Sequence, residues 1–349
     1  MILNELLTST VIFIASGALS FLSAPLFSLA LKPVAARIGA IDVPRDERRM
    51  HTRPVARIGG VALFLAFLLG GGAFLLFCRP FFTESTAHLA RRVIFGGGVI
   101  VLGGLADDAY ELSPWQKLLF QLLAALVAAA FGATLFDGWL GAAGFIFWCV
   151  LLSNAFNLID GLDGLCTRVA AFCLVALLSL SGYEPLFVIL LAALLGFLPL
   201  NLRPARLFLG DAGAMLLGFS LAVLSASVLR RSPSFISALS LSLVFALPLF
   251  DTSFAALRRM LRGKSPFSPD REHLHHRLVD GGLSHGRASL LLSLLGGGFS
   301  SLGALVFSAG VSPVCFILLL LLIFASASVI IIATAKPKSD KKDERYEKG

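Results

Sequence analysis

Acidic residues lie at the ends of three apolar segments, where lipid would exclude them. Asp107-Asp108 closes one apolar segment, Asn154–Gly164 closes a second, and Gly210–Gly213 opens a third. Ionisable groups at membrane depth are costly and therefore point to a functional site. Three such clusters on three segments predict one polar site between helices, with a divalent metal as its counter-charge.

The adjacent carboxylates Asp107 and Asp108 suit either metal binding or general-base chemistry. When they face a second acidic cluster, two carboxylates repel each other unless a cation or a proton lies between them. The competing interpretation is that both are ordinary loop residues at a membrane boundary. The sequence that follows predicts a new helix, because Ser113 can cap a helix that has Pro114 in its first turn.

Amide and carboxylate side chains recur every third residue at the end of the second apolar segment. Asn154, Asn157 and Asp160 lie along one side of a helix end, and Asp163 continues the spacing. Their oxygen atoms are the ligands that Mg²⁺ prefers, usually with phosphate oxygens and water completing the shell. Helix capping and turn chemistry are the alternative, which leaves four polar groups on an apolar helix unexplained.

Gly210-Asp211-Ala212-Gly213 lies just before a predicted helix start. Glycines at a helix N-terminus let a phosphate approach the backbone N–H groups. N-capping of the helix by Asp211 is the alternative. The segment is therefore a candidate phosphate site or a helix cap.

Two basic segments complete the set of candidate residues. His273, His275 and His276 lie within four residues, but their spacing does not match a zinc site and no cysteine is near. They suit contacts to a diphosphate, whereas the alternative is a solvated basic loop. Arg57 ends the basic stretch Arg45–Arg57, which either holds substrate or anchors the chain at the cytoplasmic face.

The composition is that of a polytopic membrane protein. Hydrophobic residues make up 57% of the 349 residues, charged residues make up 14%, and the mean hydropathy is +0.87. Soluble proteins carry about 25% charged residues. The net charge of +8 is spread in a way that indicates topology rather than a nucleic-acid partner. The five cysteines show no metal-binding spacing and are expected to be small buried apolar residues.

The predicted fold class is all-α, a membrane bundle of about eleven transmembrane helices. With the N-terminus outside and the C-terminus cytoplasmic, 24 of the 29 Lys and Arg residues fall on the cytoplasmic side. This topology also places all the acidic clusters and the histidine segment at that face. The first 31 residues lack signal-peptide features and are taken as the first span. The predicted spans are 8–31, 58–78, 92–106, 116–135, 139–157, 165–182, 185–201, 212–229, 235–256, 288–309 and 313–334.

Together these motifs resemble the polyprenyl-phosphate N-acetylhexosamine-1-phosphate transferase family, glycosyltransferase 4 type, over about residues 30–335. The motifs that carry the resemblance are Arg53–Gly60, Asp107-Asp108, Asn154–Gly164, Gly210–Gly218 and His273–His276. The resemblance implies transfer of GlcNAc-1-phosphate from a UDP-N-acetylhexosamine to undecaprenyl phosphate, with UMP released. It implies a bacterial inner-membrane enzyme with its active site at the cytoplasmic face, acting in cell-envelope polysaccharide synthesis. Residues 1–335 would form one integral membrane catalytic domain, and 336–349 a disordered charged tail.

The resemblance also assigns roles to the candidate residues. Asn157 and Asp211 would hold Mg²⁺, for which Mn²⁺ could substitute, and Asp107 and Asp108 would act near the carrier phosphate. Asp163 would contact the uracil. The remaining expected substrate-binding residues are Asp160, Lys117, Arg57, His273, His275 and His276.

The segments Pro54–Gly60 and His273–His276 are typical of the GlcNAc-1-phosphate branch of the family. The alternative within the family is a phospho-N-acetylmuramoyl-pentapeptide transferase, which usually carries three consecutive histidines. Ala214 stands where the family commonly has a serine, which leaves the choice of sugar open. The alternative from another class is a cation-coupled secondary transporter, which would place its carboxylates near the membrane midplane. A homodimer is left open.

Overall fold

The computed structural model describes residues 2–43, 54–78, 83–263 and 273–309, and almost all of these residues are helical. The elements in chain order are α1 Ile2–Ile38, β1 Ile41–Asp42, β2 Val55–Ala56, α2 Gly59–Phe77, α3 Glu84–Arg91, the π-helical turn η2 Arg92–Gly96, α4 Gly97–Tyr110, α5 Pro114–Ala130, α6 Trp139–Ile159, α7 Leu165–Ser181, α8 Pro185–Asn201, α9 Gly210–Arg231, α10 Phe235–Val244, α11 Ala246–Leu261, α12 Leu274–Asp280 and α13 His285–Ala309.

Several of these helices are long and apolar enough to cross a membrane. By length and composition six qualify within the described ranges: Leu7–Ile38, Gly59–Phe77, Glu84–Tyr110, Trp139–Ile159, Gly210–Arg231 and His285–Ala309. The bent pair α10–α11 makes a seventh, and α5, α7 and α8 are shorter apolar helices of 17 residues each. The nearly all-helical membrane architecture is confirmed. Ten of the eleven predicted spans coincide with helices or helix pairs, whereas the eleventh, 313–334, and the tail at 336–349 lie outside the described residues.

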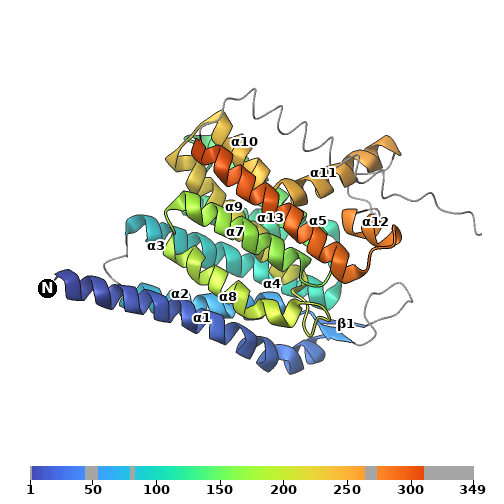
Figure 1. Cartoon of the computed structure of the whole chain (residues 1–349), viewed down its shortest axis with the longest axis horizontal. Helices are drawn as coiled ribbons and strands as arrows, with labels where there is room; N and C mark the ends of the chain where they lie inside the picture. The colour runs from blue at the N-terminus through green and yellow to red at the C-terminus, as the bar shows by residue number, and fades with distance from the viewer. Residues whose placement is uncertain (1, 44–53, 79–82, 264–272, 310–349) are drawn as a thin grey trace, which may run out of the picture.

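The predicted span over 235–256 is a bent pair of helices and not one continuous helix, because the chain bends by 85° between α10 and α11. Pro248 explains the break, since a proline ring clashes with the carbonyl four residues earlier, here that of Val244, where α10 ends. The same proline is tolerated in the first turn of α11, where its missing N–H is not needed. Helix α11 therefore leaves the bundle and approaches α12 near the site end of the molecule (Figure 1).

Helix α9 lies at the centre of the bundle and packs against α2, α4, α6 and α7 (Figure 1). Glycines allow this close approach, as is common between membrane helices. A Cβ on Gly104 of α4 would lie 2.2 Å from the Cα of Ala212, and one on Gly60 of α2 would lie 2.1 Å from the backbone N of Gly213. This close packing brings the ends of α2, α4 and α9 together.

A short antiparallel hairpin departs from the all-helical prediction. Ile41 of β1 pairs with Ala56 of β2, and the N–H of Phe208 donates to the carbonyl of Ala56. The amides of Gly59 and Gly60 then donate to the carbonyls of residues 208 and 209. These backbone bonds hold the start of α2 against the start of α9, and they place Arg57 beside Asp108.

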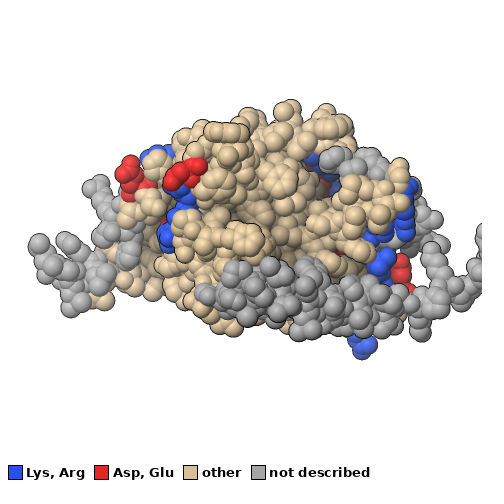
Figure 2. All heavy atoms as spheres, turned by 90° about the horizontal axis from the view of Figure 1, so that it is seen from above, with Lys and Arg blue, Asp and Glu red and all other residues tan. Residues whose placement is uncertain are grey.

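Charged side chains gather mainly at two opposite ends of the face seen in Figure 2, and uncharged residues occupy the band between them. Helix α1 packs on α2 and α8 and exposes apolar side chains such as Val11 and Leu26 on its other side. An apolar band of this kind matches a lipid-facing surface, with polar groups at the two interfaces.

Candidate functional site

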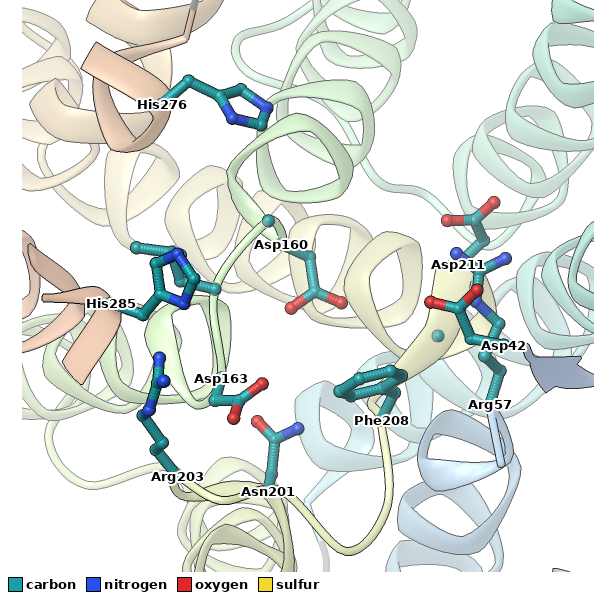
Figure 3. A pocket seen from close by; sticks show the side chains of 13 residues that line it. Asp42, Arg57, Asp160, Asp163, Asn201, Arg203, Phe208, Asp211, His276 and His285 are labelled. Atoms are coloured by element: carbon teal, nitrogen blue, oxygen red, sulfur yellow. The ribbon is translucent and has the colours of Figure 1, made fainter. Parts of the chain in front are cut away.

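Four helix ends that are far apart in the sequence meet at one end of the bundle. They are the last turn of α4, the first turn of α5, the last turn of α6 and the first turn of α9 (Figures 1 and 3). The first turn of α5 is fixed by the capping box predicted from Ser113 and Pro114, which Ser113 completes with Gln116. Every acidic cluster selected from the sequence therefore lies in one region.

Asp108 is buried and caps the first turn of α9. Its Oδ1 accepts from the N–H of Asp211 at 2.9 Å, and its Oδ2 accepts from the N–H of Ala212 at 3.2 Å. Arg57 adds a guanidinium 4.0 Å from Oδ1, and the carboxylate has no solvent exposure. The expectation that Asp211 caps the helix is wrong, because Asp108 supplies the cap. Asp108 also occupies the two backbone amides at which a phosphate was the other expectation. Gly210 allows this contact, since a Cβ there would lie 2.6 Å from Oδ2 of Asp108.

Asp107 points to a different partner from its neighbour. Its Oδ1 accepts from the N–H of Leu112 at 2.8 Å, and its Oδ2 contacts the ammonium of Lys117 on α5. The same ammonium lies 3.2 Å from Oδ2 of Asp211. Lys117 therefore joins a carboxylate at the end of α4 to a carboxylate at the start of α9.

A cavity of about 340 Å³ opens beside this cluster. In Figure 3, Asp211, Asp42 and Arg57 lie on one side of it, Asp163 and Arg203 lie on the other, and Asp160 lies between them. Carboxylates and basic side chains thus both line the cavity, which suits a ligand that carries both anionic and hydrogen-bonding groups. The polar residues that line it are Asp42, Arg57, Asp160, Asp163, Asn201, Arg203, Asp211, His276 and His285.

The loop between α6 and α7 is held in place by contacts from three other segments. Oδ2 of Asp163 accepts from the N–H of Ala205 at 3.1 Å, and its carbonyl accepts from the hydroxyl of Ser289 at 2.9 Å. Arg168 donates to that hydroxyl and to the carbonyl of Gly164. The second carboxylate oxygen of Asp163 therefore projects from a fixed backbone. Arg168 and Ser289 were not selected from the sequence.

Asp160 follows α6 and lies within the cavity. The pKa of its carboxyl is raised to about 7, mainly by burial and also by the negative charges of Asp211 and Asp163, with Arg57 opposing the increase. Protonated and ionised forms are therefore both populated near neutral pH. A cation that bound beside Asp160 would favour the ionised form and release a proton.

Asn154 and Asn157, one turn apart on α6, have different environments. Asn154 donates to Oε1 of Gln121 at 2.6 Å and to the carbonyl of Val150, so its amide joins α6 to α5. The side chain of Asn157 makes no hydrogen bond within the described ranges and remains a candidate ligand. Gln121 is a polar residue in an apolar segment, a signal that could have identified it from the sequence.

The three histidines are arranged around a buried aspartate of α11. Oδ2 of Asp251 lies 2.8 Å from Nδ1 of His273, and Oδ1 accepts from the N–H of Leu274, also at 2.8 Å. The rings of His273 and His275 are parallel, with centroids 5.8 Å apart, and His275 packs against Gly161. His276 lines the cavity, whereas the other two histidines do not. Asp251 was missed in the sequence, although it too is an acid within an apolar span.

His275 is neutral at physiological pH. The pKa of its imidazole is lowered to about 3, mainly by burial and also by the neighbouring histidines, with Asp251 opposing the decrease. Of the three histidines, His276 is thus the one placed to meet an anion in the cavity. His275 packs α12 against the loop at Gly161, and His273 holds the start of α12 to α11 through Asp251.

The donor set fits a hard divalent cation bound partly by its substrate. No group of three or more His, Cys, Asp or Glu side chains that could hold a metal ion occurs among the described residues. Asp107 and Asp211 nevertheless both reach one ammonium group, so a single cation can be within reach of both. Mg²⁺ is commonly bound by one or two carboxylates together with phosphate oxygens and water. The site therefore suits a cation that binds together with a phosphate-bearing ligand.

Comparison with known proteins places this geometry in a wider context. The model of the family described as Glycosyl transferase family 4 matches residues 91–229. This range contains the ends of α4, α6 and α9 that carry the acidic clusters. The histidine segment and Arg57 lie outside it.

Three curated bacterial proteins are similar to the chain over most of its length. A probable undecaprenyl-phosphate N-acetylglucosaminyl 1-phosphate transferase of Bacillus subtilis (strain 168) is 33% identical, covering 86% of this chain and 87% of that protein. A decaprenyl-phosphate N-acetylglucosaminephosphotransferase of Mycobacterium tuberculosis is 34% identical, covering 76% and 75%. An undecaprenyl-phosphate alpha-N-acetylglucosaminyl 1-phosphate transferase of Escherichia coli (strain K12) is 29% identical, covering 82% and 81%.

Proposed function

The chain belongs to glycosyl transferase family 4, with the polyprenyl-phosphate N-acetylglucosamine-1-phosphate transferases, and from this premise we propose its reaction. It transfers GlcNAc-1-phosphate from UDP-GlcNAc to undecaprenyl phosphate. A phosphate oxygen of the carrier attacks the phosphorus next to the sugar, the bond from that phosphorus to the bridging oxygen breaks, and UMP leaves. One diphosphate is exchanged for another, so catalysis mainly requires positioning and charge stabilisation.

The observation that carries the proposal is the mixed lining of the cavity at the helix ends. Arg57, Arg203 and His276 offer donors for the phosphates of a nucleotide sugar, and Asp211 faces the same space. Cations around a diphosphate stabilise the charge that moves during phosphoryl transfer. The position of the cavity at the end of apolar helices gives a lipid-linked acceptor access to it.

Two carboxylates are assigned separate roles toward the two substrates. Asp163 keeps one carboxylate oxygen after its bond to Ala205, and that oxygen is available to accept from the uracil N3–H. Asp107 is assigned to the carrier phosphate, which it orients and whose last proton it accepts. That proton has a pKa of about 6 in related phosphate esters, so the requirement on the base is modest.

Asp211 and Asn157 are the residues assigned to hold Mg²⁺, or Mn²⁺ in its place, and Asp107 lies within reach of the same ion. When bound, the ion would supply charge neutralisation for the diphosphate. The chain's own residues bring the substrates together. Asp108 fixes the first turn of α9, and Lys117 balances the negative charge of Asp107 and Asp211.

The direct test is release of UMP by the purified full-length protein. Undecaprenyl phosphate, Mg²⁺ and a panel of UDP-sugars would be supplied, with reactions lacking the lipid as the control for hydrolysis. UDP-GlcNAc is expected to give lipid-dependent UMP. Preference for UDP-N-acetylmuramoyl-pentapeptide would favour the alternative branch, and ion-coupled substrate uptake into vesicles without UMP release would favour a transporter.

We place the site at the cytoplasmic face of the bacterial plasma membrane, with the N-terminus outside. A cysteine at exposed Ser284, between α12 and α13, should react with an impermeant maleimide only after the membrane is opened. A cysteine at exposed Ser232, between α9 and α10, should react in intact cells. Both would be made in a Cys315→Ser background, because the other four cysteines are buried. Labelling of Ser284→Cys from outside would overturn the orientation.

Asp251→Asn is expected to lower kcat by roughly ten- to a hundredfold with little change in KM for the sugar nucleotide, because Asp251 holds His273 and the first turn of α12, the helix that carries His276 to the cavity. The amide oxygen still accepts from Leu274, but its NH₂ group faces Nδ1 of His273 and favours the opposite tautomer. The ¹⁵N NMR spectrum of the imidazoles reports the tautomer directly. Asp280→Asn, at the exposed end of α12, is the matched control. Wild-type kinetics in Asp251→Asn would show that Asp251 does not position His273 for the reaction.

A further inference from the structure

Lys117 occupies a position that is unusual for a simple surface ion pair. Its ammonium contacts Oδ2 of Asp107 and lies 3.2 Å from Oδ2 of Asp211, so it bridges two carboxylates from two other helices. The Asp107 side chain is 2% exposed, whereas those of Lys117 and Asp211 are 27% and 23% exposed. The bridge therefore lies at the border between the protein interior and the cavity.

The oxygen atoms that hold this ammonium are those that a divalent cation needs. Two cations cannot occupy the space between the same two oxygens, because they overlap and repel each other. Asp108 offers no substitute ligand, since both its oxygens accept from the amides of α9 and its side chain is fully buried. A divalent cation that binds Oδ2 of Asp107 and Oδ2 of Asp211 together must therefore displace Lys117.

Lysine is suited to such a displacement. Its charge is carried on a flexible four-carbon stem, and the ammonium can move to a new anion without loss of its charge. Here the stem starts one turn into α5, whose first turn is fixed by the capping box of Ser113 and Gln116. Only the side chain has to move, while the helix ends around the cavity stay in place.

We propose that Lys117 is a displaceable counter-ion of the metal site. It holds Asp107 and Asp211 together before the divalent cation binds, then releases them to the cation and turns its ammonium to the diphosphate of the sugar nucleotide. The inference rests on the proposed function for the identity of that diphosphate. Its first half, competition between Lys117 and the metal, concerns the protein alone.

This role predicts opposite effects on metal binding and on turnover when the charge is removed. Lys117→Met should bind a divalent cation about tenfold more tightly. This is the change in affinity expected when a positive charge a few ångströms from the metal is removed in surroundings with the dielectric constant of water. The same variant should lose most of its turnover, because the ammonium no longer reaches the diphosphate. If Lys117 merely supported the fold, its substitution would lower both metal affinity and turnover. If it oriented the metal ligands, its substitution would weaken metal binding.

The experiment measures Mn²⁺ binding by electron paramagnetic resonance on the purified full-length protein without substrates. Lys117→Met removes the charge, Lys117→Gln removes it but keeps a donor for the carboxylates, and Lys117→Arg keeps the charge. Arg203→Met is the control, because it removes a positive charge that lines the cavity but is not part of the Asp107–Lys117–Asp211 bridge. Tighter Mn²⁺ binding is expected for the Met and Gln variants only. Unchanged or weaker binding in Lys117→Gln would overturn the proposal.

A second measurement uses the wild-type protein and does not depend on the folding of any variant. The rate at which an amine-selective reagent modifies Lys117, followed by mass spectrometry, should rise when Mn²⁺ is added, because the ammonium is released from its carboxylates. An unchanged or slower rate would also overturn the proposal. These outcomes are separate from the UMP assay: lipid-dependent UMP release without the Mn²⁺ effects rejects the role of Lys117 alone, and the reverse result rejects the reaction alone.

Discussion

Asp211→Asn is expected to reduce turnover about a thousandfold, equivalent to about 4 kcal/mol of transition-state stabilisation. The substitution keeps the size of the side chain but removes the charge that faces the cavity and Lys117. A neutral amide can neither balance that ammonium nor serve as an anionic ligand for a divalent cation. The measurement is lipid-dependent UMP release at limiting and at saturating Mg²⁺.

The variant should remain folded, which makes the test informative. The first turn of α9 is capped by Asp108 through the backbone amides of Asp211 and Ala212, and those bonds do not use the Asp211 side chain. Its melting temperature in detergent should therefore stay close to that of the wild type. Glu111→Gln, at an exposed position after α4, is a control for loss of one carboxylate near the site. If Asp211→Asn kept more than a tenth of wild-type activity at limiting Mg²⁺, the assignment of Asp211 would be wrong.

Gly104→Ala is expected to lower activity at least a hundredfold and to destabilise the protein by about 1–3 kcal/mol or more. The added Cβ would lie 2.2 Å from the Cα of Ala212 and 2.5 Å from its backbone N, where no side chain can move aside. Helix α4 must therefore shift away from α9. The shift would separate Asp107 and Asp108 from the first turn of α9, so both the ion bridge and the cap would weaken.

Gly98→Ala is the matched control on the same helix. A Cβ at Gly98 would meet only the ring of Phe64, at 3.9 Å, which is an ordinary contact. We expect this variant to keep activity within a fewfold and to melt near the wild-type temperature. Thermal unfolding in detergent and UMP release would be measured on both variants. Equal behaviour of the two would mean that α4 and α9 do not approach as closely as the structure places them.

The pattern of apolar segments was enough to predict where the helices lie and that their polar ends collect in one place. A helix in lipid must satisfy its own backbone, so about 20 apolar residues mark a span whatever its neighbours are. Capping of α5 by Ser113 and close packing at the glycines of α4 were also predictable, because both depend on local geometry. These features follow from residues near one another in the sequence.

Tertiary structure decided which polar residue has which partner. Asp107 and Asp108 are adjacent, but successive residues of a helix point about 100° apart, so one faces Lys117 and the other faces the amides of α9. Asn154 could not be separated from Asn157 without knowledge of Gln121, which is 33 residues earlier on another helix. The spacing of polar residues in the sequence identifies side chains that can bind a ligand. The packing of distant helices decides which of these side chains already have a hydrogen-bond partner within the protein.

The histidine segment shows the same division. Its composition indicated contacts to an anion, and His276 does line the cavity. His273 is instead held by Asp251 of α11, and His275 packs against Gly161 in the loop between α6 and α7. Nothing in the sequence around the histidines indicates these two partners. The bend at Pro248 that brings α11 and Asp251 to α12 was present in the sequence as a helix breaker. The direction of this bend could not be predicted from the sequence, because it is set by the helices against which α10 and α11 pack.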